Sequence, residues 1–490
     1  MRSDLRTEYG AAKQSGVSGD TGQTKPKAKR RKPAAAPAPE TPDEGLRGHK
    51  RMALRFANLF RGTFAHTPGR GWLEFTGAYW QECGESRPWN AVHNVCRYAL
   101  VDLADIPRPD WRDELYADVR ACDSANGTAG VLKHVQHWPG IGLRDDQLDA
   151  HPELFVCQNG TIDLTTGEFR QSRPEDYMTI AAGVDYDPEA DCPEYDRLLA
   201  LYHADPAVRD YLHRLGGAAM EGRQNIQALI VNYGSTGGNG KGTVQRAWMH
   251  VFGAYAHILP VEALIARKGY DQYRDEKAQL RGKRLVYLTE PSAGQRFDTG
   301  VVKSITGGDP VTSRAVYKAA VTFDPTWLIM MATNNRVSTP NDGGMARRLK
   351  EIGWTYTVPD DQRDESGRID DTLRGEGPGI LNRLLAGWID FQKDGVQEPE
   401  SVTQTTADYL ASVDPVARFI DECVQAQDTQ TPSSSMYAAY DKWCRDNGEH
   451  PMSNRLFSPD LERRGWQKKA TKAGNVWVGV ALVARESDRW

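Results

Sequence analysis

A glycine-rich segment in the middle of the chain limits the possible folds more than any other part of it. The segment ALIVNYGSTGGNGKGTVQRAWMHVFG occupies residues 228–253. Its apolar beginning predicts a buried strand, and the spacing of apolar residues at its end predicts a helix. A strand, a glycine-rich loop ending in Gly-Lys and a helix, in this order, make up a P-loop. We therefore predict an α/β sheet that carries a phosphate site at the end of this strand.

The residues of this loop suit a phosphate. Glycines let the backbone turn its N–H groups inward, the helix presents its positive end, and Lys241 supplies a cation for the β- and γ-phosphates. The strict pattern GxxxxGK[ST] is not met, because Ser235 stands at its first glycine and Gly242 follows the lysine. Thr243 therefore either reaches Mg²⁺, directly or through water, or leaves the ion to carboxylates and phosphate oxygens. The residues predicted to bind nucleotide are Gly234, Ser235, Thr236, Gly237, Gly238, Asn239, Gly240, Lys241, Gly242 and Thr243.

Two later apolar runs end in polar residues that a nucleotide site needs. The run in GKRLVYLTEP, residues 282–291, ends at Glu290, and the run in TWLIMMATNN, residues 326–335, ends at Asn334 and Asn335. Ligands of open α/β sheets bind at the carboxyl ends of the strands. We therefore predict that Glu290 holds Mg²⁺ and activates water, and that Asn334 contacts this water or the γ-phosphate. Taken alone, the first motif is equally typical of a surface glutamate after a core strand, and the second is most often a turn.

Length and composition exclude several classes of protein. A chain of 490 residues suggests about three domains at roughly 150 residues each. The seven cysteines include no Cys-x-x-Cys pair, which argues against a disulfide framework and a zinc ribbon. No apolar run approaches the roughly 18 residues of a membrane helix, and we expect a cytoplasmic protein. The net charge of 61 − 66 = −5 hides a basic N-terminus, where residues 1–50 sum to 11 − 6 = +5.

Five motifs in order resemble superfamily III helicases of the phage and plasmid primase–helicase type. Similarity extends upstream to CQNGTIDLTTGEF at 157–169 and downstream to YAAYDKWCRDNG at 437–448, and covers about residues 50–485. The five motifs are GSTGGNGKGT (234–243), GKRLVYLTEP (282–291), VKSITGGDPVTSRAVYK (302–318), LIMMATNN (328–335) and GGMARRLKEIGW (343–354).

The resemblance implies the fold class and the domain organisation. The fold class is α/β, with a P-loop AAA+-like ATPase core preceded by a mixed α+β module and followed by a small winged-helix domain. The implied domains are a disordered basic tail (1–45), an N-terminal α+β module (46–190), a helical lead-in or collar (191–222), the superfamily III ATPase domain (223–427) and the winged-helix-like domain (431–490).

The resemblance also implies a homo-hexameric ring with ATP and Mg²⁺ bound between subunits. Arg347 and Arg348 match the family's paired arginines, one of which acts on the γ-phosphate of the neighbouring subunit. The segment equivalent to 302–324 forms a hairpin that lines the pore, in which Arg314 and Lys318 contact DNA phosphates and Tyr317 packs or stacks. The less specific alternatives are salt bridges for the arginines and a basic sheet edge for the hairpin.

The end of the chain is locally basic. Between Arg455 and Lys472, six basic and two acidic residues sum to 6 − 2 = +4. In a winged helix, residues 453–465 form the recognition helix and residues 468–479 the wing. We expect Trp466 and Trp477 in the core; the alternative for the whole segment is a solvated basic helix. The residues predicted to contact DNA here are Arg463, Arg464, Lys468 and Lys469.

These observations predict an ATP-dependent DNA helicase of phage or plasmid replication. It would draw single-stranded DNA through a ring, unwind forked duplex DNA in a bacterial host cytoplasm, and work with a separate primase or replication initiator. One alternative is a primase or primase-associated subunit. It is disfavoured because the sequence leaves no free domain for a primase-polymerase and has no clustered cysteines for a zinc module. The other alternative is an origin-binding or loader ATPase that does not unwind DNA.

Overall fold

The computed structural model describes residues 43, 45–265, 277–292, 294–313, 321–339, 343–364, 366–449 and 451–483. Every helix and strand named below belongs to the compact unit Arg47–Trp490. Apart from Asp43 and Gly45, the predicted basic tail lies outside the described residues, as do the predicted pore residues Arg314, Tyr317 and Lys318. No described helix is long and apolar enough to cross a membrane.

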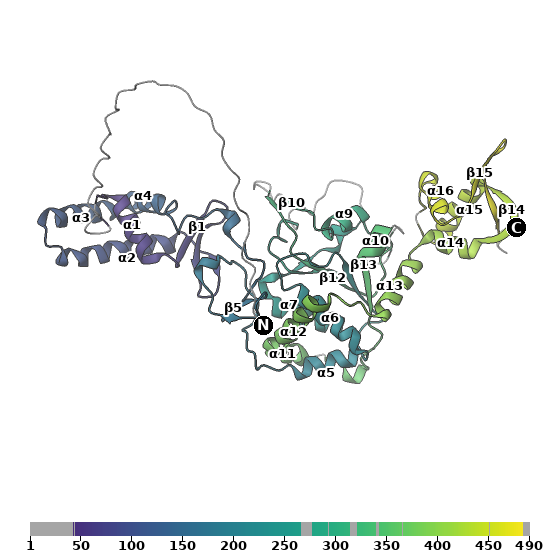
Figure 1. Ribbon diagram of the computed structural model, residues 1–490, viewed down its shortest axis with the longest axis horizontal. Coiled ribbons are helices and arrows are strands. Elements are labelled where there is room, and N and C mark those ends of the chain that lie inside the picture. Colours follow the sequence, from purple (N-terminus) through teal and green to yellow (C-terminus); the bar gives the residue numbers. More distant parts are fainter. Residues whose placement is uncertain are drawn as a thin grey trace, which may run out of the picture. The chain divides into compact units, whose positions relative to one another are not determined.

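The first part of this unit is a group of four helices with a small antiparallel sheet of order β1-β2-β3 (Figure 1). The amphipathic pattern of α1 buries Met52 and Phe56 against Val92 of α2 and Val131 of α4. The elements are α1 (His49–Phe60), β1 (Phe64–Thr67), β2 (Gly71–Phe75), β3 (Trp80–Glu82), α2 (Ser86–Asp102), α3 (Pro109–Cys122) and α4 (Ala125–Val135).

A second small sheet and two helices lead to the main sheet. Strands β4 (Leu154–Cys157) and β5 (Gly160–Asp163) form an antiparallel hairpin around Asn159, as the Asn-Gly turn predicts, and β6 (Phe169–Arg170) adds a third strand. The helices α5 (Pro193–Tyr202) and α6 (Pro206–Ala218) are separated at Asp205. Its side chain accepts a hydrogen bond from the Ala207 N–H and so caps α6.

The central sheet has five parallel strands in the order β13-β7-β12-β9-β8. Alternate residues enter two different cores: Ile230 and Met330 face one, and Val231 and Ile329 face the other. Such continuous apolar strands are typical of a sheet covered on both faces, and this parallel sheet confirms the α/β prediction. The strands are β7 (Leu229–Tyr233), β8 (Ala256–Leu259), β9 (Leu285–Leu288), β12 (Leu328–Thr333) and β13 (Leu349–Gly353).

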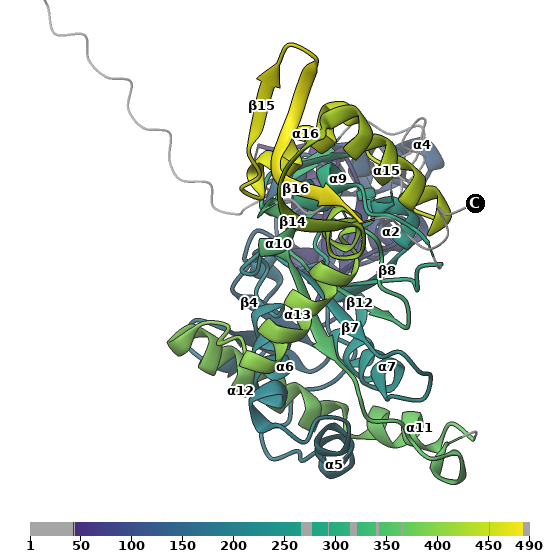
Figure 2. The same cartoon turned by 90° about the vertical axis from the view of Figure 1, so that its right-hand side faces the viewer.

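Helices cover both faces of this sheet (Figures 1 and 2). α6 and α12 pack closely at Gly217, where the absence of a side chain makes room for the backbone of α12. A Cβ at this position would lie 2.2 Å from the Trp388 nitrogen. The predicted hairpin arms pair as β10 (Val311–Ser313) and β11 (Val321–Phe323). The remaining helices are α7 (Lys241–Phe252), α9 (Thr299–Ile305), α10 (Gly343–Arg348), α11 (Arg368–Gly375), α12 (Gly377–Asp394) and α13 (Glu400–Ser412).

The C-terminal elements share a separate aromatic core. Phe419 and Phe457 contact Tyr440, Trp477 is fully buried as predicted, and Trp466 packs edge-on against it. The antiparallel sheet has the order β14-β16-β15, and Figure 2 shows β15 and β16 extending beyond the helices of this core. The elements are α14 (Pro415–Cys423), β14 (Val424–Pro432), α15 (Ser433–Asp446), α16 (Asn454–Arg463), β15 (Lys468–Thr471) and β16 (Gly474–Leu482).

We expect the protein to lose stability in mild acid, because two of its histidines are buried. Burial lowers the pKa of His203 and of His213 to about 4, and the Nε2 atom of each has no hydrogen-bond partner within the described residues. Below about pH 6.5, the ordinary pKa of histidine, these two imidazoles bind protons in the unfolded chain but remain neutral in the folded chain down to about pH 4. Stability is therefore complete above pH 6.5 and falls toward pH 4, by roughly 2 kcal/mol per histidine at pH 5.

Urea unfolding midpoints at pH 7 and pH 5 measure this loss. The double variant His203→Phe/His213→Phe should lose distinctly less stability between the two pH values than the natural chain. The matched control is His134→Ala, because His134 is exposed and its replacement should leave the pH dependence unchanged. An equal pH dependence in the double variant and the natural chain would rule out these two imidazoles as its source.

Candidate functional site

The glycine-rich loop connects the carboxyl end of β7 to the first turn of α7. Gly238 and Gly240 adopt left-handed backbone conformations, with φ of 74° and 85°. Gly240 has no room for a side chain, because a Cβ there would lie 2.3 Å from ring atoms of Tyr202. Alternating left- and right-handed conformations turn successive N–H groups toward one point. The loop therefore has the backbone geometry of an anion site.

Lys241 begins α7 and points to the end of the sheet. Its Nζ donates to Gly234 O (3.2 Å), to Asn239 Oδ1 (3.0 Å) and to Asn334 Oδ1 (2.8 Å). Burial lowers the pKa of Lys241, and the charge of Glu290 opposes this shift. A half-buried ammonium held by three oxygen atoms is well placed to exchange them for phosphate oxygens.

Three predicted residues from three adjacent strands meet at this edge. Asn334 follows β12, Glu290 follows β9, and Lys241 follows the loop after β7. The Asn334 backbone N–H donates to Glu290 Oε1 at 3.0 Å, while the Asn334 side chain accepts from Lys241. The structure thus connects the cation, the amide and the carboxylate in one short chain of hydrogen bonds.

Thr243 lies on the other side of the loop, at a cavity. It lines this cavity together with Tyr202, which is almost completely buried. Gly242, directly after the lysine, offers no hydroxyl. Glu290, the carboxylate predicted to hold Mg²⁺, lies beside Lys241 in a position that suits a divalent cation.

A segment after β13 holds the loop in place. We call residues 354–363 the strap. Val358 N donates to Gly238 O (2.9 Å), and the hydroxyls of Thr236 and Thr357 are 3.0 Å apart. Asn239, only 3% exposed, donates from Nδ2 to Tyr356 O at 2.7 Å. Asn239 therefore joins Lys241 to the strap, a role that the motif alone did not reveal.

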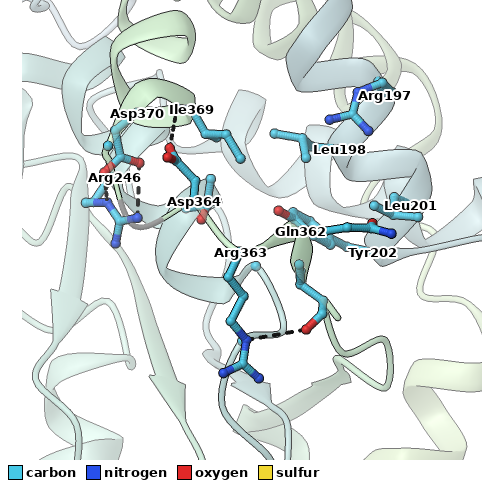
Figure 3. A pocket seen from close by; sticks show the side chains of 15 residues that line it. Arg197, Leu198, Leu201, Tyr202, Arg246, Gln362, Arg363, Asp364, Ile369 and Asp370 are labelled. Carbon is cyan, nitrogen blue, oxygen red and sulfur yellow. Dashed lines mark hydrogen bonds and ion pairs between the residues drawn. The ribbon is translucent and has the colours of Figure 1, made fainter. Parts of the chain in front are cut away.

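A cavity of about 340 Å³ lies beside the loop, between α5, α7, α11 and the strap. Figure 3 shows Leu198 and Ile369 facing each other across it. Tyr202 and Thr243 line the side nearest the loop. The cavity residues on α5, α11 and the strap could not be recognised in the sequence, because no local motif marks them and only the fold brings them to the loop.

Arg347 and Arg348 end the short helix α10. Arg347 is exposed, and its Nε donates to Gly343 O at 3.1 Å. Arg348 is partly buried and donates to Gly344 O at 3.3 Å. Within the part of the chain that the structure describes, neither guanidinium forms an ion pair. Both are therefore available to a phosphate, and Arg347 is the more accessible.

The predicted DNA-contacting residues near the C-terminus differ in their surroundings. Lys469 is exposed on β15, and Lys468 lies 3.9 Å from Glu462. Arg463 pairs with Asp460 at 2.6 Å and remains 62% exposed. Arg464 forms two ion pairs, with Asp414 at 2.6 Å and with Asp460 at 2.8 Å. This double ion pair gives Arg464 a structural role, since it joins α16 to the start of α14.

Three family models match successive parts of the chain. The family D5 N terminal like matches residues 53–201, and the family Poxvirus D5 protein-like matches residues 411–479. Between them, a family of unknown function, DUF5906, matches residues 232–348. The "Putative helicase L207/L206" of Acanthamoeba polyphaga mimivirus is 25% identical over 324 residues. These matches support the resemblance of the chain to phage and viral primase–helicases.

The matched viral relatives are longer proteins. The alignment covers 61% of this chain and 34% of the mimivirus protein. "Putative helicase 022R" of Frog virus 3 is 22% identical over 388 residues, which are 62% of this chain and 40% of that protein. Among solved structures, the C-terminal region of NrS-1 has a TM-score of 0.38 at 14% identity, and the match covers 61% of this chain and 77% of that chain.

Proposed function

We propose that the chain is an ATP-dependent DNA helicase of superfamily III that translocates single-stranded DNA through a ring during phage, plasmid or viral replication. The observation that carries this proposal is the meeting of Lys241, Asn334 and Glu290 at the ends of three adjacent strands. A cation, a neutral amide and a carboxylate at one sheet edge are the groups that phosphoryl transfer to water needs.

The residues present fit a nucleotide with Mg²⁺. The N–H groups of the loop and Lys241 would hold the phosphates, and the apolar faces of Leu198 and Ile369 would enclose the base in the cavity. Bound Mg²⁺ would neutralise developing charge on the phosphates. Glu290 would hold the ion and take a proton from the attacking water. The water oxygen would bond to the γ-phosphorus while the bond from this phosphorus to the β–γ bridging oxygen breaks and ADP leaves.

Asn334 would report the presence of the γ-phosphate. In this structure its side-chain oxygen accepts from Lys241. A bound triphosphate would draw the ammonium away and free the amide to orient water, while the Asn334 N–H still positions Glu290. The DNA contacts would come from Arg463, Lys468 and Lys469 of a winged-helix-like domain and, outside the described residues, from Arg314, Tyr317 and Lys318.

Mixing two inactive variants tests the proposed ring with shared sites. Arg347→Ala should bind ATP but hydrolyse it roughly a thousandfold more slowly, the usual loss for an arginine that stabilises the transferred phosphoryl group. Lys241→Ala should be inactive at its own site but still offer Arg347 to a neighbour. A mixture of the two should regain measurable ATP hydrolysis, because some interfaces then contain both residues.

The same mixture with Arg348→Ala in place of Arg347→Ala shows which arginine acts across the interface. Steady-state phosphate release is the measurement, at a fixed total protein concentration. Full activity of both single arginine variants, or a mixture no more active than its components, would contradict a site completed by the neighbouring subunit.

A further inference from the structure

Arg363 lies at the end of the strap, beside the tip of the glycine-rich loop. A Cβ built on Gly238 would be 3.2 Å from Arg363 Nε and 3.3 Å from one terminal guanidinium nitrogen. Gly238 is one of the two left-handed glycines that turn the loop N–H groups inward. The guanidinium therefore lies next to the point where the loop would hold a phosphate.

The other two arginines of the cavity are firmly held. Arg246 donates twice to Asp370, at 2.8 and 3.0 Å, and Arg197 donates twice to Glu194, at 2.8 and 2.6 Å. Two parallel hydrogen bonds fix a guanidinium and satisfy most of its charge. Figure 3 shows Arg246 engaged with Asp370 in this way.

Arg363 is held much more weakly. One terminal nitrogen contacts Asp360 at 3.0 Å, and the Asp360 side chain is 89% exposed. Its Nε donates to the carbonyl oxygen of Val358 at the long distance of 3.4 Å. A single ion pair with an exposed carboxylate contributes little and is easily exchanged. A bound polyphosphate offers several negatively charged oxygens and would compete strongly for this guanidinium.

We propose that Arg363 is a second phosphate-binding cation of the same subunit, which leaves Asp360 for a nucleotide phosphate and thereby fastens the strap over the bound nucleotide. The strap is already joined to the loop through Val358 and Gly238. A contact between Arg363, at the end of the strap, and a phosphate would also attach the strap to the nucleotide. This inference rests on the proposed function, since it needs a nucleotide in the loop.

Calorimetric titration with a non-hydrolysable ATP analogue and with adenosine, each with Mg²⁺, tests the role. Arg363→Ala should weaken binding of the analogue roughly tenfold to a hundredfold, the usual effect of losing hydrogen bonds between charged groups. Its affinity for adenosine should stay unchanged, because only the phosphates are contacted. Asp360→Ala, which removes the competing partner, should tighten binding of the analogue about twofold or more. Arg197→Ala is the matched control and should not discriminate between the two ligands.

The outcomes separate this inference from the proposed function. Failure of the natural chain to bind the analogue would remove the proposed nucleotide site and this inference with it. Binding by the natural chain together with unchanged affinity in Arg363→Ala would overturn the inference alone. An equal loss for adenosine and the analogue would also overturn it, because the contact would then lie on the nucleoside. Arg363 is about half exposed, so we expect Arg363→Ala to fold with an unchanged melting temperature.

Discussion

Replacement of Lys241 by alanine is expected to reduce ATP hydrolysis at least about a hundredfold, the usual cost of removing one group that stabilises the transition state. The ammonium is the one charged group of the loop, and it lies 2.8 Å from Asn334 Oδ1 at the end of the sheet. Without it, the γ-phosphate would lose its cation and Asn334 its present hydrogen-bond donor. Steady-state phosphate release, with and without single-stranded DNA, measures the loss.

Lys393→Ala is the matched control for this variant. Lys393 lies near the end of α12, 77% exposed, and its nearest ionic contact is Asp394 at 4.0 Å. Its replacement should leave hydrolysis unchanged. The melting temperatures of both variants should stay within a few degrees of that of the natural chain, since neither side chain belongs to a core. Normal turnover by Lys241→Ala would refute the assignment of the loop as the ATP site.

The largest expected effect on stability comes from Arg284→Met. Arg284 is 3% exposed, directly before β9, and its guanidinium donates to the carbonyl oxygens of Met220 and Leu154. It also lies over the ring of Tyr255, 4.3 Å from the centroid. Methionine would keep the apolar stem but leave both carbonyls unsatisfied. A buried unsatisfied group costs about 1–3 kcal/mol, so we expect a loss of about 3 kcal/mol or more.

Urea unfolding of the chain at pH 7 measures this loss as a lower midpoint. Arg281→Met is the matched control, because Arg281 is only partly buried and donates to the carbonyl oxygen of Asp145 at 3.2 Å. Its replacement should cost less than about 1 kcal/mol. Equal midpoints for the two variants would show that the contacts of Arg284 do not hold β4 and the end of α6 to the sheet.

The parallel sheet and its loop could be predicted because their signals are local. Three of the five central strands, β7, β9 and β12, are short and mainly apolar runs, and the glycines before Lys241 stand together in the sequence. The edge strands β8 and β13 gave no such signal, because polar residues interrupt them. The positions of Glu290 and Asn334 then follow from a general rule, since polar residues after parallel strands reach the same edge.

The cavity could not be predicted, because its walls are far apart in the chain. Leu198 and Tyr202 belong to α5, whereas Arg363 and Ile369 follow β13. Neither segment has a motif that indicates a ligand. Likewise, the basic run near the C-terminus gave no sign that Arg464 is bound by Asp414, fifty residues earlier. Charge patterns show which residues are basic, but only the fold shows which of them are already paired.

The decisive measurement is the separation of a forked DNA duplex by the purified chain, with and without ATP and Mg²⁺. We predict that the natural chain separates the strands only when ATP is present, and that Lys241→Ala separates none under the same conditions. Hydrolysis of ATP without strand separation at any salt concentration would contradict the proposed helicase and would favour an ATPase that only controls assembly on DNA.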